Sequence, residues 1–292
     1  MGNPRLAIAL GSGSARGWAH IGVLRALLQA GVVPDIVCGT SIGAFVGAAY
    51  ASGSLDPLEG WVRGLTRRDV LGFFDVSLVA GGLIKGEKLL GYTSRLFLDE
   101  TFADLDKPFA CVATDLASGR EVWLREGRVV DAVRASVALP GLLVPQLLDG
   151  RHLVDGGLVN PVPVSLCRAL GADIVIAVDL GMDTIGLWQR RGDLSATAPA
   201  WRQTMGRWLG REGDGDGEDV ARPSLADVVS NSIAIMQGRI SRSRLAGEPA
   251  DVLIAPRLGQ LGLLDFHRAH EAIAAGRMAA EHMLPMLRAI IE

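Results

Sequence analysis

The sequence has few of the residues on which several classes of protein depend. Of its 292 residues, 5% are aromatic, five are histidine and three are cysteine. An odd number of cysteines without regular spacing excludes a disulfide framework, and Cys38, Cys111 and Cys167 lie in apolar runs typical of a core. His267 and His270 have no third ligand nearby in the sequence, so we expect neither a metal nor another cofactor.

The charge balance and the hydropathy exclude two further classes. The formal net charge is −3 and the pI is about 6.0, so nucleic acid is not an expected partner. No apolar stretch approaches the roughly 20 residues that a helix needs to cross a bilayer. The start of the chain, Met1 to Arg5, leads straight into a short apolar run and does not have the pattern of a signal peptide. We therefore expect a cytoplasmic protein whose contact with membranes, if any, is peripheral.

The chain is rich in glycine, with 37 residues distributed between short apolar runs and helical patterns. Residues 6–10 form an apolar run, 11–17 a flexible loop and 18–30 a helical pattern. A second apolar run at 33–38 is followed by another loop and a helix that ends at Ala51. Two successive strand–loop–helix units predict an α/β fold with a parallel sheet, whose loops lie at the carboxyl ends of the strands.

The remaining pattern predicts more elements of the same kind. Residues 55–105 look mostly helical but less regular. Further strands are expected at 109–114, 121–124, 174–178 and 252–254, and further helices at 129–138, 164–170, 224–245 and 266–291. The strand at 121–124 is expected to pair with the one before it across the turn at Ser118 and Gly119. We expect a single domain over residues 5–292, with an insertion or lid at about 183–222, where the regular pattern fails.

Ser41 lies in the one segment that is built for covalent chemistry. It is the centre of Gly39-Thr40-Ser41-Ile42-Gly43, which follows an apolar run and precedes a run of small residues. A G-x-S-x-G sequence between a strand and a helix is typical of a nucleophile elbow, in which a tight turn exposes the serine hydroxyl. The N-terminus of the following helix directs N–H groups toward the same place.

The loop Gly11–Gly17 is a candidate oxyanion hole. Its members Ser12, Gly13, Ser14, Ala15, Arg16 and Gly17 are small apart from one arginine, so successive backbone N–H groups can converge on one point. Arg16 would add positive charge or anchor the loop. The alternative is a phosphate-binding loop, but no Walker lysine follows, and Asp35 precedes the second strand instead of ending it.

A serine nucleophile needs a base, and the histidines are poorly placed for that role. None of the five follows a late strand, as the histidine of a Ser-Asp-His hydrolase does. Asp155 is the better candidate because it ends an apolar run and is followed by Gly156 and Gly157, which can present a carboxylate to a neighbour. The alternative is a simple Asp-Gly turn without a chemical role.

Together, the three motifs resemble those of the patatin-like phospholipases, in particular the compact bacterial acyl hydrolases. The surrounding segments Ala19–Leu24 and Ala135–Gly141 are also similar, and the resemblance extends over most of residues 5–180. It implies a three-layer fold with a central, mainly parallel sheet flanked by helices. It also implies a Ser-Asp dyad, in which Ser41 attacks an acyl ester, Asp155 acts as base and the loop around Gly13 and Ser14 forms the oxyanion hole.

The sequence departs from the family pattern at Ser12 and Ser14, where glycine is usual. A serine at positive φ is costly because of its Cβ atom. We therefore expect either that these serines adopt ordinary φ angles or that the oxyanion hole has a different shape, to which their hydroxyls can donate hydrogen bonds.

The segment 183–222 contains a tryptophan-rich helical pattern. Trp201, Met205, Trp208 and Leu209 have the spacing of one helix face, with several arginines nearby. Such a helix suits a lipid interface or a lid over an acyl groove, and the alternative is an ordinary amphipathic helix packed on the body. The acidic residues 213–219 lack the spacing of a calcium loop.

The leading hypothesis is a serine acyl hydrolase that acts on phospholipid, lysophospholipid or neutral glyceride. A second hypothesis is a weakly catalytic or non-catalytic regulator that uses the fold to bind lipid, membrane or a protein partner. The two serines in the glycine loop favour this regulator, whereas retention of both Ser41 and Asp155 speaks against it. An acyltransferase, which would share the acyl-enzyme but exclude water, is the third.

Overall fold

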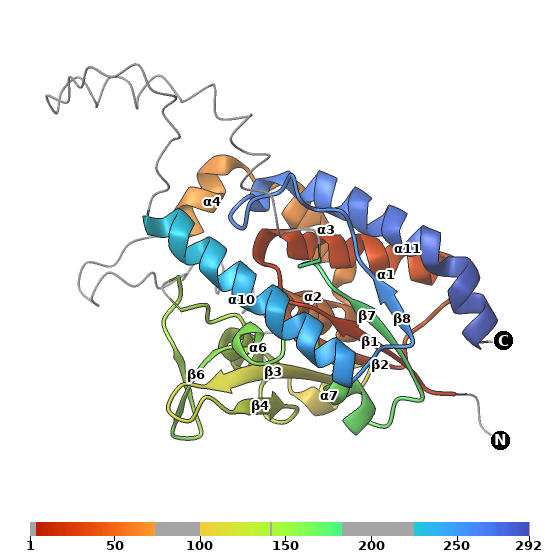
Figure 1. Cartoon of the computed structure of the whole chain (residues 1–292), viewed down its shortest axis with the longest axis horizontal. Coiled ribbons are helices and arrows are strands. Elements are labelled where there is room, and N and C mark those ends of the chain that lie inside the picture. The colour runs from red at the N-terminus through yellow and green to blue at the C-terminus, as the bar shows by residue number, and fades with distance from the viewer. Residues whose placement is uncertain (1–3, 74–99, 141, 183–224, 292) are drawn as a thin grey trace, which may run out of the picture.

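A single mixed sheet forms the centre of the protein (Figure 1). The computed structural model describes residues 4–73, 100–140, 142–182 and 225–291. Within these ranges the sheet has eight strands: β1 Leu6–Leu10, β2 Ile36–Thr40, β3 Phe109–Asp115, β4 Glu121–Leu124, β5 Gln146–Leu148, β6 Arg151–Asp155, β7 Ile174–Val178 and β8 Val252–Ile254. The expected strands at 6–10, 174–178 and 252–254 are confirmed residue for residue.

The strands follow the order β5-β6-β3-β2-β1-β7-β8, and β4 pairs with the second edge of β3. Pairing is parallel from β3 through β2, β1 and β7 to β8, and antiparallel where β4, β5 and β6 join. In the centre, Ile8 is level with Val37 of β2 and Ile176 of β7. Because β1 and β2 are parallel neighbours, the loops that follow them emerge at the same edge of the sheet.

Helices cover both faces of this sheet. The α-helices are α1 Ala19–Gln29, α2 Ile42–Ala51, α3 Leu55–Arg63, α4 Arg67–Phe73, α6 Val129–Ser136, α7 Val164–Ala169, α10 Leu225–Gly247 and α11 Ala269–Ile291. Short 3-10 helices are η1 Ser14–Trp18, η3 Phe102–Asp104, η4 Gly156–Leu158 and η6 Phe266–Arg268. None of these described helices combines the length and the apolar character that a bilayer-crossing helix requires.

Alternation along the strands divides the core into two layers. Leu6, Ile8 and Leu10 belong to the larger cluster, with residues of α1, α2 and α11. Ala7 and Ala9 face the opposite way, into a smaller cluster with residues of α7. In Figure 1, α11 (dark blue) lies along α1, and α10 (light blue) runs in front of the strands. The expected three-layer α/β fold with a mainly parallel sheet flanked by helices is confirmed.

Several expected boundaries differ from those in the structure. The strand predicted at 33–38 is β2, Ile36–Thr40, since Val33 is exposed and Pro34 has no N–H to contribute to a ladder. The helix predicted from Trp18 begins at Ala19, after η1, and the last helix likewise begins as η6. The proposed lid at 183–222, with Trp201, Trp208 and the neighbouring arginines, lies outside the described residues.

Candidate active site

Ser41 occupies a sharp turn between β2 and α2. Its backbone has φ 57° and ψ −124°, a conformation that side-chain-bearing residues rarely adopt. The turn needs glycine on both sides, because a methyl group on Gly39 would lie 2.5 Å from the Ala44 Cα atom and one on Gly43 would lie 2.1 Å from the Leu10 carbonyl oxygen. Ser41 is therefore held at the N-terminus of α2, where the helix dipole favours negative charge.

A second serine, from another element, fixes this turn. Ser136, the last residue of α6, accepts a hydrogen bond from the Ser41 N–H at 2.9 Å and donates one to the Val112 carbonyl at 2.6 Å. Ser136 is fully buried. Sequence reasoning included it in a similar segment but gave it no role, since nothing local relates residues 41 and 136.

Asp155 ends β6 with its carboxylate directed at Ser41. The Ser41 hydroxyl donates to Asp155 Oδ2 at 2.5 Å, and the Gly157 N–H donates to Oδ1 at 2.7 Å. Gly156 passes so close to β3 that a methyl group there would lie 2.2 Å from the Val112 carbonyl oxygen. The structure thus brings together the serine and the carboxylate that the motifs singled out, although they are 114 residues apart.

Burial changes the acidity of this carboxyl group. Asp155 is 1% exposed, and loss of hydration raises its pKa from 3.8 to about 6. The hydrogen bonds from Ser41 and Gly157 act in the opposite direction but are weaker in total. A carboxylate with a pKa of about 6 is a stronger base than an ordinary aspartate and is still ionised at neutral pH.

The loop after β1 contributes two residues to the wall of the site. Gly13 and Ser14 line the cavity beside Ser41, and within the described part of the chain their backbone N–H groups have no acceptor. Three other N–H groups of the predicted oxyanion loop donate to backbone carbonyl groups of the protein. Ser12 donates to the Pro161 carbonyl, Ala15 to that of Leu263 and Arg16 to that of Gly13.

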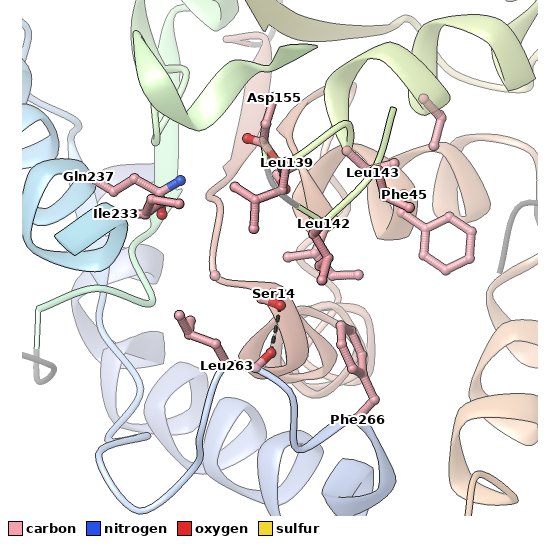
Figure 2. Close-up of a pocket in the computed structure, with 15 residues that line it drawn as sticks. Ser14, Phe45, Leu139, Leu142, Leu143, Asp155, Ile233, Gln237, Leu263 and Phe266 are labelled. Carbon is pink, nitrogen blue, oxygen red and sulfur yellow. Dashed lines mark hydrogen bonds between the residues drawn. The ribbon is translucent and has the colours of Figure 1, made fainter. Parts of the chain in front are cut away.

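Of the two serines that replace glycine, only Ser14 has the costly backbone. Its φ is 53°, and its hydroxyl donates to the Leu263 carbonyl at 2.6 Å, a bond that helps to hold this conformation (Figure 2). Ser12 does not have a positive φ. Arg16 is buried and its Nε donates to the Leu261 carbonyl at 3.0 Å, so it anchors the loop to the segment before α11.

None of the five histidines lines the cavity beside Ser41. His20 is completely buried, and its Nε2 lies 2.7 Å from the Gly11 carbonyl oxygen, at the start of the oxyanion loop. Burial lowers its pKa to about 4, against a smaller opposite effect of that hydrogen bond, so His20 is neutral at pH 7. His267 and His270 contact Arg67 and Arg63, and no group of three metal-ligating side chains occurs in the part of the chain that the structure describes.

An apolar cavity of about 720 Å³, including its open mouth, adjoins Ser41 and Asp155. Figure 2 shows Leu139, Leu142 and Leu143 on one side of the space. On the opposite side Ile233 and Gln237 project from α10, while Leu263 and Phe266 close the lower part of the view. The apolar stretch that begins at Leu139 therefore forms a wall of this cavity.

Asn160, Glu121 and Arg244, to which the sequence analysis gave no role, connect the elbow residue Thr40 to α10. Thr40 donates its hydroxyl to the Asn160 carbonyl at 2.8 Å, and the Asn160 amide donates to Glu121 of β4 at 2.7 Å. Glu121 in turn pairs with Arg244 of α10 at 2.9 Å. This chain of contacts connects the nucleophile turn to α10, and no local pattern in the sequence indicates it.

A three-layer α/β fold in which a serine elbow and an Asp-Gly-Gly turn meet at one edge of the sheet defines the class of patatin-like proteins. The chain belongs to the patatin-like phospholipase family, whose sequence model matches residues 8–168. At the level of the family, this places the chain among the lipid hydrolases.

Named relatives cover the chain well beyond the matched region. An uncharacterized NTE family protein of Mycobacterium tuberculosis is 34% identical over 97% of this chain and 92% of its own length. Human patatin-like phospholipase domain-containing protein 6 is 38% identical over 77% of this chain, and lysophospholipase NTE1 of Pyricularia oryzae is 31% identical over 96% of it. The matched regions are only 16% and 18% of these two longer proteins.

The similarity extends to a solved structure. VipD from Legionella pneumophila aligns with 97% of this chain and 67% of its own chain, with a TM-score of 0.51 and 13% sequence identity. At that identity the likeness concerns the fold alone.

Proposed function

We propose that the protein is a serine acyl hydrolase that cleaves fatty-acyl ester bonds of phospholipids, lysophospholipids or related lipids through a Ser41–Asp155 dyad. The observation that carries this proposal is the 2.5 Å hydrogen bond between the Ser41 hydroxyl and the Asp155 carboxylate at the wall of an apolar cavity. In the same cavity, the Gly13 and Ser14 N–H groups have no described acceptor.

In the first half of the reaction, Ser41 Oγ attacks the ester carbonyl while Asp155 Oδ2 takes its proton. Negative charge develops on the former carbonyl oxygen, and the N–H groups of Gly13 and Ser14 with the N-terminus of α2 stabilise it in the proposed mechanism. The protonated Asp155 then gives its proton to the departing alcohol oxygen. The acyl group remains on Ser41 as an ester.

In the second half, water takes the place of the alcohol. Asp155, ionised again, accepts a proton from the water as it attacks the acyl carbonyl, and the same N–H groups stabilise the second oxyanion. Proton return from Asp155 to Ser41 Oγ releases the fatty acid. Both halves need a carboxylate that is ionised yet basic, which is the state that burial gives to Asp155 at neutral pH.

The substrate class follows from the lining of the cavity. Its mostly apolar walls, formed by Val133, Leu139, Leu142 and Phe45 among others, suit an acyl chain. The lysophospholipase name of the Pyricularia oryzae relative supports a phospholipid-derived ester among the substrates.

The test is hydrolysis of a short and a long p-nitrophenyl ester, and of phospholipid in vesicles, by wild type, Ser41→Ala and Asp155→Asn. We expect wild type to hydrolyse the long ester and both variants to lose at least about a thousandfold in kcat. Unchanged circular dichroism spectra would show that the variants are folded. Equal activity of wild type and variants would refute the dyad.

Labelling with a fluorophosphonate distinguishes the hydrolase from the regulator. The proposed mechanism predicts a covalent adduct on wild type that is absent from Ser41→Ala. A folded wild-type protein that neither reacts with the probe nor hydrolyses any of the three substrates would favour a regulator that binds lipid without cleaving it.

A further inference from the structure

Among the described side chains of α10, Gln237 is the polar one that lines the cavity beside Ser41. It lies beyond residues 8–168, to which the family model is confined. In Figure 2 its side chain extends from α10 into the cavity, on the side opposite Leu142 and Leu143. The leucine wall (Leu139, Leu142 and Leu143) and this amide therefore lie on different sides of the cavity beside Ser41.

The amide bridges the two loops that hold the site. Its Oε1 accepts a long hydrogen bond of 3.5 Å from the Ser12 hydroxyl. Its Nε2 lies over the Asp155–Gly157 turn, so near that a methyl group on Gly157 would be 2.4 Å away. Gln237 thus faces the oxyanion loop with one atom of its amide and the acidic turn with the other.

The Nε2 group is available to a ligand. Four side chains that line the cavity are polar: Ser14, Ser41, Asp155 and Gln237. The Ser14 hydroxyl donates to Leu263, and Ser41 donates to Asp155, which cannot donate when ionised. Among the described residues, Gln237 Nε2 has no acceptor, so the amide carries the free side-chain donor of this cavity.

A smaller cavity continues from this point. This recess lies between the oxyanion loop, Leu180 and α10, its volume of about 340 Å³ includes open solvent, and Gln237 lines both spaces. This second space is more polar, since Ser12, Arg16, Asp179 and Ser241 contribute to its walls. A substrate with its acyl chain on the leucine side would therefore have its alcohol portion on the Gln237 side.

We propose that Gln237 is a specificity-determining residue that donates a hydrogen bond from Nε2 to an oxygen of the glycerol portion of the substrate, next to the scissile ester. The inference rests on the proposed acyl hydrolase function. It concerns the hydroxyl-bearing alcohol and not the acyl chain. A site built to bind such an oxygen discriminates against an ester that lacks it.

The experiment compares monooctanoylglycerol with ethyl octanoate, which has the same acyl chain and no hydroxyl group. Gln237→Met keeps the approximate shape of the side chain and removes the donor. We expect the ratio of kcat/KM for the glycerol ester to that for the ethyl ester to fall roughly five- to tenfold, the range for one neutral hydrogen bond. An unchanged ratio, or an equal loss on both esters, would overturn the proposal.

Octanoyl lysophosphatidylcholine distinguishes two sources of the contact, because it has the glycerol hydroxyl beside a phosphodiester. If Gln237→Met lowers kcat/KM, relative to that for ethyl octanoate, on both monooctanoylglycerol and octanoyl lysophosphatidylcholine, the contact is to glycerol. If it lowers kcat/KM on the phospholipid alone, the contact is to the phosphodiester and the proposal is refuted. Ile233→Val, one turn away on the same wall, is the control and is expected to change all three substrates by one common factor.

A binding measurement keeps the inference testable without hydrolysis. In the Ser41→Ala background, octylglycerol ether is expected to bind more tightly than ethyl octyl ether, and Gln237→Met, or Gln237→Leu if the first variant does not fold, is expected to remove the difference. If the proposed function failed but this inference held, wild type would hydrolyse none of the esters, whereas octylglycerol ether would still bind more tightly than ethyl octyl ether. Equal binding of both ethers before substitution would overturn the role of Gln237.

Discussion

Ser136 accepts the backbone N–H of Ser41 at 2.9 Å and thereby ties the end of α6 to the nucleophile turn. In Ser136→Ala, the buried Ser41 N–H and the Val112 carbonyl both lose this partner. Because a buried polar group without a partner is costly, we expect a loss of about 1–3 kcal/mol in the free energy of unfolding. Release of the strained turn is expected to lower kcat roughly tenfold or more.

Urea unfolding and kinetics on a long p-nitrophenyl ester measure the two effects. Ser52→Ala is the matched control, since Ser52 follows α2, is partly buried and donates to the Ala49 carbonyl at 3.3 Å, away from the site. Equal kcat values for Ser136→Ala and Ser52→Ala would show that the turn keeps its geometry without this anchor.

The raised pKa of Asp155 predicts the pH dependence of hydrolysis. If the ionised carboxylate is the base, kcat/KM should follow its deprotonated fraction, with a midpoint at about pH 6. Activity at pH 5 is then expected to be about one-tenth of the plateau reached above pH 7. The profile is measured with an uncharged ester, and circular dichroism verifies folding at each pH. A midpoint of kcat/KM near pH 4 would contradict the assignment.

The same burial means that ionisation of Asp155 lowers the free energy of unfolding. Its pKa is about 6 when folded and 3.8 when exposed, so the folded state binds more protons between these values and its stability falls as pH rises through that window. The total penalty above pH 6 is about 3 kcal/mol, of which about 1 kcal/mol develops between pH 5 and pH 8. Asp155→Asn does not titrate and escapes this penalty.

We therefore expect the stability of Asp155→Asn relative to wild type to increase by about 1 kcal/mol from pH 5 to pH 8 in urea unfolding. His20 has a lowered pKa of about 4, so its folded form loses stability as pH falls from 6.5 toward 4. That effect is common to both proteins and cancels in the difference. A difference that is constant with pH would mean that Asp155 is not desolvated.

The central strands and the separate motifs around Ser41 and Asp155 could be predicted from sequence because their signals are local, whereas the pairing of the two residues was implied by the resemblance of the motifs to a family. Each motif consists of a few consecutive residues after an apolar run, and the parallel pairing of β1 and β2 brings the loops that follow them to one edge. Asp155 ends β6, which is antiparallel to β3, and the register that pairs Asp155 with Ala113 was not predictable from these local signals. The start of β2 could not be predicted from hydrophobicity alone, since Val33 is apolar yet exposed. Its neighbour Pro34, which has no N–H to donate to a strand ladder, does indicate that the strand begins later.

The supporting contacts could not be predicted because they join distant parts of the chain. Ser14 and Leu263 are 249 residues apart, and Ser12 and Gln237 are 225 apart. The helical pattern around Gln237 did predict a helix, but a helix has several faces and the sequence does not say which one meets the site. The φ of Ser14 was likewise open, and its hydrogen bond to Leu263 explains how a serine keeps a conformation that usually requires glycine.

The contact between α1 and α11 depends on two glycines. A methyl group on Gly276 would lie 2.0 Å from the Ala19 carbonyl oxygen, and one on Gly22 would lie 1.9 Å from that of Ile273. Both glycines are within helices, where alanine is normally favoured by about 1 kcal/mol. We nevertheless expect Gly276→Ala to lower the free energy of unfolding by about 1–3 kcal/mol, because two backbones must move apart.

Gly60→Ala is the matched control for this prediction, because Gly60 lies inside α3 and a methyl group there would meet nothing within 4 Å. The same substitution should then stabilise the protein by about 0.5–1 kcal/mol, since alanine restricts the unfolded chain more than glycine does. Thermal and urea unfolding of the two variants would give shifts of opposite sign. Stabilisation by both substitutions would show that α1 and α11 are not in backbone contact at Gly276, and that the larger core layer is packed more loosely than the structure shows.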